Sequence, residues 1–129
     1  MANRQLLGKV GSIGQDNLIA KLTPATETFG IVINKLASGD DVVIQRGTIL
    51  TADENGKYSV FSGEKDTVPS AVLCDDVTVT TAADVTAVAY RSGNFNRKAV
   101  ITGNDHTLTA ADEDALRKYD IILTDMLDA

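Results

Sequence analysis

Two side-chain types that often take part in catalysis occur once each in this sequence: the single histidine is His106, and the single cysteine is Cys74. A histidine beside a carboxylate can act as a general base, and Asp105 directly precedes His106. This pair lies in a polar, glycine-containing stretch, which is typical of a solvated loop. Cys74 ends an apolar run and is expected to be a buried, inert thiol. We therefore predict that the chain is not an enzyme, with a hydrolase that uses Cys74 or His106 as one alternative.

Metal and cofactor chemistry find no support in the sequence. It contains no nucleophile-elbow, zinc-protease, phosphate-loop or dinucleotide-binding motif. A single cysteine can form neither an internal disulfide nor a zinc site by itself. Residues 53–56, Asp-Glu-Asn-Gly, imitate part of a calcium loop, but Ser62 stands where such a loop needs a bidentate glutamate. We predict no catalytic, cofactor-binding or metal-binding residues.

Charge and length narrow the class of protein further. The 129 residues are enough for one compact domain. Twelve Lys and Arg against eighteen Asp and Glu give a net charge of −6, which argues against binding to nucleic acid. No apolar run approaches the ~20 residues of a membrane-spanning helix, and the first residues lack the apolar core of a signal peptide. We expect a soluble protein with neither a nucleic-acid nor a membrane partner.

Short apolar or alternating runs between turn residues predict a mainly β fold. The candidate strands are residues 29–33, 42–44, 48–50, 57–61, 71–74, 77–79, 85–90, 99–101 and 121–123. This pattern is typical of a small β-sandwich or a barrel-like domain. One C-terminal helix is predicted, capped by Thr109. Its apolar face, expected to pack on the sheet, consists of Ala111, Ala115, Leu116 and Tyr119.

Two turns are predicted between these strands. Asn55-Gly56 suits a tight hairpin, because these residues tolerate positive φ. A second turn is expected at Ser92-Gly93-Asn94, with positive φ at Gly93. Phe95 is interpreted as the anchor of the strand that follows, with a contact to a neighbouring protomer as the alternative.

The N-terminal part of the chain has a different character. Residues 1–28 contain glycines at positions 8, 11 and 14 and no sustained apolar period, which indicates an extended arm before a β-rich domain at 29–129. The arm is too apolar for a solubilising tail and is expected to order on a partner, for example by adding a strand to a sheet edge. The alternative is an arm that packs on its own domain. The candidate contact residues are Leu6, Leu7, Val10, Ile13, Leu18 and Ile19.

Several segments, read in order, resemble the lambda-type head decoration proteins of phages, a capsid-stabilising family. They are residues 46–50 (RGTIL), 56–58 (GKY), 71–77 (AVLCDDV), 88–96 (VAYRSGNFN) and 116–123 (LRKYDIIL). The resemblance covers about residues 42–123. It departs from the family pattern at Ala71, where a glycine commonly precedes the apolar pair.

The resemblance implies a structural virion protein, made in the host cytoplasm and placed on the outer surface of the expanded capsid. Such cement proteins usually sit as trimers at three-fold or quasi-three-fold positions. The arm would contact the major capsid protein, and no catalysis, metal or cofactor is implied. The alternative from the residues themselves is a β-rich binding module for a small ligand or carbohydrate, which the shortage of aromatic residues counts against.

Overall fold

The computed structural model describes residues 17–21 and 24–125. Its elements are β1 (Ile19–Lys21), β2 (Glu27–Ile33), β3 (Val42–Ile44), β4 (Ile49–Ala52), β5 (Tyr58–Val60), β6 (Pro69–Leu73), β7 (Val77–Val79), β8 (Val85–Asn96), a 3₁₀ turn (Gly103–Asp105), α1 (Ala110–Arg117) and β9 (Ile121–Thr124). The fold is mainly β with one C-terminal helix, as the sequence predicts.

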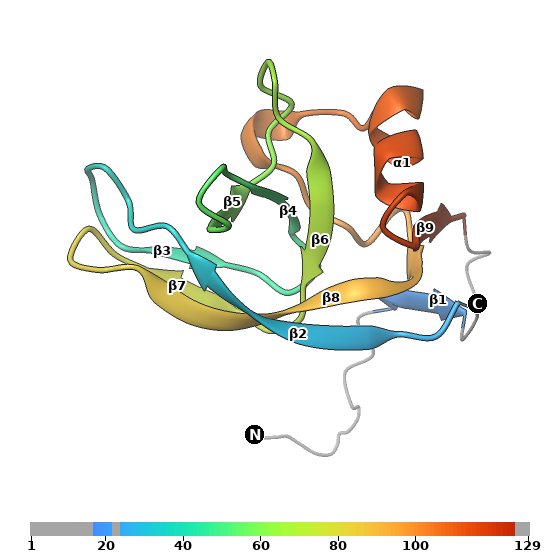
Figure 1. Cartoon of the computed structure of the whole chain (residues 1–129), viewed down its shortest axis with the longest axis horizontal. Helices are drawn as coiled ribbons and strands as arrows, with labels where there is room; N and C mark the ends of the chain where they lie inside the picture. The colour runs from blue at the N-terminus through green and yellow to red at the C-terminus, as the bar shows by residue number, and fades with distance from the viewer. Residues whose placement is uncertain (1–16, 22–23, 126–129) are drawn as a thin grey trace.

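Five strands close into a small barrel (Figure 1). They follow the order β8-β2-β5-β4-β6, and β6 pairs again with β8, where Val72 lies opposite Tyr90. The β2–β5 pair is parallel, and the other pairs of the barrel are antiparallel. Strands β3 and β7 form a separate two-stranded ribbon at the left of Figure 1, away from α1. The barrel-like alternative of the sequence analysis is therefore confirmed.

Strand β8 is the longest strand and joins the two halves of the domain. Its first half pairs with β2, and its second half pairs with β1 on one side and with β9 in parallel on the other. The turn predicted at residues 92–94 is wrong, because these residues continue β8. The expected positive φ at Gly93 is present, at +148°. A Cβ on Gly93 would lie 2.8 Å from Cζ of Phe95, so a glycine lets the strand pass under that ring.

The core has two apolar clusters on opposite faces of the same strands. Ile49, Val72 and Tyr90 pack outside the barrel with residues of β1, β9 and α1. Their chain neighbours Leu50 and Ala89 pack inside it. Strands buried on both faces need consecutive apolar residues, which explains the uninterrupted runs in β4 and β6.

Phe95 is fully buried in the outer cluster, and its ring centroid lies 5.2 Å from that of Tyr90. Phe95 is thus an anchor, but it anchors β8 itself and not a following strand as the sequence analysis expects. This burial leaves the side chain no surface for a neighbouring protomer.

The hairpin turn at Asn55-Gly56 lies where the sequence predicts it, between β4 and β5. Gly56 has a φ of +78°. The Asp53 carboxylate accepts backbone hydrogen bonds from Asn55 at 2.8 Å and Lys57 at 3.0 Å. The side-chain amide of Asn34, 3.1 Å from Asp53, and these backbone bonds hold the pKa of Asp53 below its ordinary value.

The predicted helix is confirmed, but its packing face is narrower than expected. Thr109 caps α1 in a capping box with Asp112. Within the helix only Leu116 is fully buried, whereas Ala111 is exposed. Tyr119 follows the helix and is 48% exposed. Because α1 has only about two turns, one leucine is enough to fix it on the outer cluster.

Two predictions about strands and boundaries need correction. Residues 99–101 form no strand, and Ile101 makes only an isolated bridge to Thr48. Conversely, β1 pairs with β8 within a segment predicted to be an arm. The predicted boundary between residues 28 and 29 falls inside β2. The alternative of an arm that packs on its own domain describes residues 18–21.

Candidate functional site

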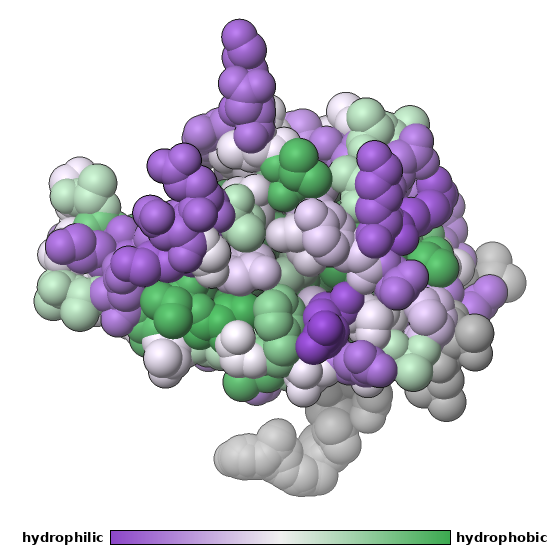
Figure 2. Space-filling view, in the orientation of Figure 1, coloured by the Kyte–Doolittle hydropathy of each residue, from purple (hydrophilic) through white to green (hydrophobic). Residues whose placement is uncertain are grey.

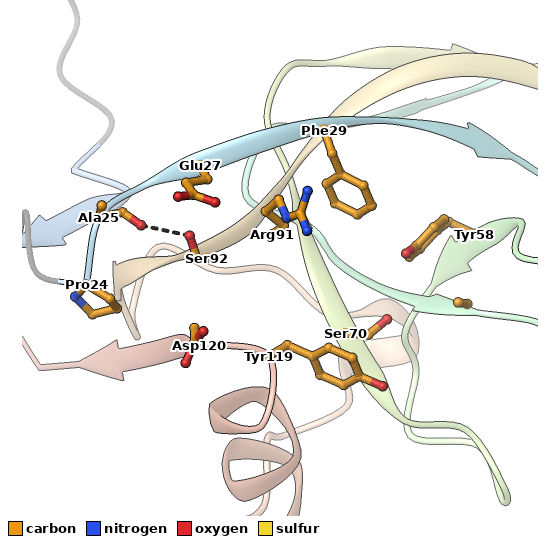
Figure 3. Close-up of a pocket in the computed structure, with 11 residues that line it drawn as sticks. Pro24, Ala25, Glu27, Phe29, Tyr58, Ser70, Arg91, Ser92, Tyr119 and Asp120 are labelled. Carbon is orange, nitrogen blue, oxygen red and sulfur yellow. Dashed lines mark hydrogen bonds between the residues drawn. The ribbon is translucent and has the colours of Figure 1, made fainter.

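A groove with a volume of about 570 Å³ opens between strands β2, β5 and β8 and the turn that follows α1 (Figure 3). Phe29 comes from β2, Tyr58 from β5, Arg91 from β8 and Tyr119 from the turn. Four segments that are far apart in the sequence therefore meet here. The barrel closure positions three of them, and the capped helix positions the fourth.

Aromatic side chains form one end of this groove. The ring centroids of Phe29 and Tyr58 lie 6.0 Å apart with an interplanar angle of 81°, an edge-to-face contact. Cζ of Arg91 lies 5.7 Å from the centroid of Phe29, in range of a cation–π interaction. The other three of the six aromatic residues, Phe61, Tyr90 and Phe95, are buried in the core. Every aromatic residue with exposed surface thus lies at this one groove.

The polar groups of the groove are divided between its ends. Figure 3 shows Glu27 and Asp120 near Pro24, away from Tyr58, with Arg91 between Glu27 and Phe29. Burial raises the pKa of the Tyr58 phenol, with a smaller contribution from Tyr119, so at neutral pH it is an uncharged hydroxyl. The aromatic end therefore combines apolar surface, one guanidinium and phenol hydroxyls, which are groups that bind a partner.

A buried hydroxyl at this end has no partner. Ser70 lines the groove, and its Oγ is buried without a hydrogen bond among the described residues. At the opposite end, Oγ of Ser92 donates to the backbone oxygen of Ala25 at 2.7 Å and fastens the rim. Buried hydroxyls are usually paired, so the unpaired Ser70 marks the groove floor as a place where a partner group would be stabilised.

Hydrophobic surface continues from the groove along the barrel. A shallower hollow shares Phe29 and Tyr58 with it and extends over Val32 and Ala87. Figure 2 shows hydrophobic side chains gathered low in the middle of the view, over β2 and β8. The sequence analysis missed this surface, because its aromatic residues are separated in the chain and carry no motif.

His106 is not the solvated loop histidine that the sequence predicts. Its Nε2 lies 2.7 Å from Oδ2 of Asp112, not beside Asp105, and the two side chains are 20% and 17% exposed. Its ring meets that of Phe61 edge-on at 5.4 Å. Gly63 lies so close that a Cβ there would overlap the imidazole ring of His106. The histidine is thus packed between the helix N-terminus and a loop.

Hydrogen bonding controls the charge of Asp112 at this helix N-terminus. Burial alone would raise the pKa of Asp112, but the backbone N–H of Thr109 and the His106 ring hold it below its ordinary value. The same carboxylate closes the capping box. The pair therefore fixes the start of α1.

Cys74 is half-buried against the outer cluster, so it is more accessible than the buried thiol that the sequence predicts. Arg46 donates hydrogen bonds to the Cys74 backbone oxygen at 2.8 Å and to the Tyr90 hydroxyl at 2.5 Å. Burial raises the pKa of Tyr90, and the Cys74 thiol raises it further. These contacts tie β6 to β8 beside the barrel closure.

The candidate arm residues fall into two groups. Leu6, Leu7, Val10 and Ile13 lie outside the described residues. Leu18 is 2% exposed in the outer cluster, and Ile19 is half-buried on β1. Leu18 therefore belongs to the core of its own domain, and the capsid contacts of the arm stay a prediction.

Neither a metal centre nor a membrane-spanning helix is found in the part of the chain that the structure describes. No group of three or more His, Cys, Asp or Glu side chains is arranged there to hold a metal ion. No helix there has the length and apolar character needed to cross a membrane.

Comparison with known proteins places this barrel and groove in a family. The family model of bacteriophage lambda head decoration protein D matches residues 23–121, which span β2 to the start of β9. No curated protein matches the chain. The matched region is most of the sequence and contains the whole barrel. The chain therefore belongs to the family of bacteriophage lambda head decoration protein D and is a structural decoration component of a phage head.

Proposed function

We propose that this decoration protein binds the outer surface of the expanded capsid and stabilises it, as trimers at three-fold or quasi-three-fold positions. Its partner is the major capsid protein, and it is made in the host cytoplasm before it reaches the virion. The observation that carries the proposal is the family match over residues 23–121. A barrel with an exposed aromatic groove supplies an adhesive surface, which is what a cement protein needs.

The N-terminal arm is the proposed capsid contact. We place its boundary with the folded domain before Leu18, because that side chain is in the core. Arg4, Lys9 and Asp16 are the charged side chains of residues 1–16, so the arm is net positive whereas the whole chain carries −6. Leu6, Leu7, Val10 and Ile13 are the proposed apolar contacts.

Strand β1 connects this arm to the domain and offers a way to extend it. Among the described strands, β1 lies at the end of the sheet order and pairs only with β8. No described strand pairs with its other edge, which is the proposed site for an extended segment of a partner. Ile19, half-buried on this strand, is a further proposed contact. Ordering the arm costs conformational entropy, but three arms per trimer act together and increase the avidity.

Co-sedimentation with immature and expanded shells of the source virus tests this function. We expect saturable binding to expanded shells, with a copy number divisible by three, and no binding to immature shells. Failure to bind either form would contradict the proposal. Equal binding to both forms would show that the protein does not recognise the expanded state of the shell.

The groove supports one alternative function, a binding module for a small ligand or carbohydrate. Its half-exposed Tyr119 and nearby Arg91 are residue types that contact sugar rings and their hydroxyls. A thermal-shift screen with glycans discriminates this alternative, because a specific ligand raises the melting temperature with its concentration.

A further inference from the structure

We propose that neighbouring copies of this chain contact each other head to tail, with the β3–β7 ribbon of one copy in the aromatic end of the groove of the next. The inference rests on the proposed assembly into trimers and names the two surfaces that meet. We call residues 34–44 and 77–84 the flap, since they include the ribbon and its two connecting loops.

The flap presents a continuous exposed surface. Residues 37–43 are all exposed, and Val42 and Val43 are 46% and 58% exposed. Asp40 and Asp41 precede these valines, and neither carboxylate has an ion pair or hydrogen bond in the described chain. An exposed strand with two valines is a surface that proteins usually cover.

The groove presents the complementary chemistry. Its aromatic end combines Phe29, Tyr58 and Tyr119 with the guanidinium of Arg91, which is exposed and makes no ion pair among the described residues. Tyrosine and arginine are among the residue types that contribute most at protein interfaces. The flap valines fit the rings, and a flap aspartate fits Arg91 as a charge-assisted hydrogen bond.

Charge also fixes the direction of entry. Glu27 and Asp120 lie at the opposite end of the groove and repel Asp40 and Asp41. The acidic tip of the flap is therefore restricted to the Arg91 end. The orientation of the flap is therefore determined both by its attraction to Arg91 and by its repulsion from Glu27 and Asp120.

The positions of the two surfaces favour a second copy as the occupant. The flap projects at the left of Figure 1, whereas the groove lies between β2 and the turn after α1. Different patches on one chain make a heterologous contact, and such contacts close into a ring when the rotation between copies allows it. In a ring of three copies, each flap would occupy the groove of the next copy, and no flap or groove would be left without a partner.

Cross-linking between single-cysteine copies tests the contact directly. In a Cys74→Ser background, one copy carries Ser38→Cys on the flap and the other carries Ala52→Cys at the groove, so the proposed contact residues stay intact. The control pair combines Ser38→Cys with Lys98→Cys, an exposed position outside the groove. Oxidation is carried out in concentrated solution and on shells, and disulfide-linked mixed dimers are identified by mass. We expect them for the flap–groove pair and not for the control pair.

A charge reversal shows whether Arg91 makes the contact. Arg91→Glu is expected to lower the cross-linked fraction by about tenfold, the effect of one lost charge-assisted contact. Lys98→Glu changes the net charge equally and should leave the fraction unchanged. Asp40→Arg with Asp41→Arg should restore cross-linking to the Arg91→Glu groove.

The outcomes separate this inference from the proposed function. No flap–groove cross-link in solution or on shells overturns the inference, even if the chain binds shells. A cross-link in solution without shell binding supports the inference and contradicts the proposed function. If Arg91→Glu weakens shell binding without changing the cross-links, Arg91 contacts another partner, and its proposed contact with the flap aspartates is wrong.

Discussion

The His106 imidazole and the Asp112 carboxylate lie 2.7 Å apart where α1 begins, with each side chain about four-fifths buried. This contact joins the loop that packs on Phe61 to the helix that covers the outer cluster. Asp105, which directly precedes His106 in the sequence, takes no part in this contact. Spatial neighbours, and not chain neighbours, therefore decide what the single histidine does.

Replacing His106 by alanine should destabilise the domain by about 1–2 kcal/mol, because a partly buried hydrogen bond and a ring contact are lost. A solvated histidine would change the stability by no more than about 0.5 kcal/mol. Chemical denaturation of His106→Ala, with Asp105→Ala as the control, distinguishes the two. Equal small effects would show that the contact contributes nothing.

The depressed pKa of Asp112 predicts loss of stability in acid. A carboxyl group whose pKa is lower in the folded state stabilises the fold above its unfolded value, near 3.8. This stabilisation is lost as the pH falls through the folded pKa. Asp112→Asn should therefore be less stable than the parent chain at pH 6, and the difference should shrink below pH 3.8. Thermal melts across this range check it, and a difference that grows in acid would contradict the sign.

Gly93 should tolerate no side chain. Its φ of +148° and the 2.8 Å approach to Phe95 mean that Gly93→Val adds both backbone strain and a clash. We expect a loss of about 2–4 kcal/mol, read as a lower melting temperature. Gly30→Ala in β2 is the matched control, because nothing lies within 4 Å of its added Cβ. Similar melting temperatures for both variants would show that β8 relaxes around the valine.

Local sequence patterns predict the strands, because the pattern of a strand lies entirely within that strand's own residues. The alternation in residues 85–90, the apolar run before Cys74 and the capping box of Thr109 are local signals, and the structure confirms them. The barrel closure is different. It depends on the pairing of Val72 with Tyr90, and no feature within either segment specifies the other.

The same reasoning explains what the sequence missed at the groove and at Gly93. Phe29, Tyr58 and Tyr119 come together only because the barrel closes and the helix docks. At residues 92–94, turn-forming residue types continue a strand, because β1 and β9 supply hydrogen bonds on both sides. Tertiary pairing overrides local propensity there.

Truncating the arm should separate capsid binding from folding. Removing residues 1–16 leaves Leu18 and β1 in place, so we expect an unchanged melting temperature and loss of shell binding. Removing residues 1–22 also deletes Leu18 from the core and should destabilise the domain by about 2–4 kcal/mol. Melting and co-sedimentation of both variants check this. Full shell binding by the shorter truncation would show that residues 1–16 are not the contact.

Arg97 should be sensitive to a change that keeps its charge. Its guanidinium donates two hydrogen bonds to Glu113 at 2.8 and 3.0 Å and one to the Leu123 backbone oxygen at 3.0 Å, so it joins β8, α1 and β9. A lysine cannot form this planar arrangement. Because the Arg97 side chain is 34% exposed, we expect Arg97→Lys to cost only about 1 kcal/mol.

The exposed Arg117–Asp114 pair provides the control for this measurement. Arg117→Lys retains a single surface ion pair and should change the stability by less than about 0.5 kcal/mol. Urea denaturation of the two variants in low and high salt separates the effects: most of the Arg97 effect should persist in salt, because geometry and not net charge is lost. If salt removes the difference between the two variants, Arg97 acts as an ordinary surface charge and the three elements are held together by the apolar cluster alone.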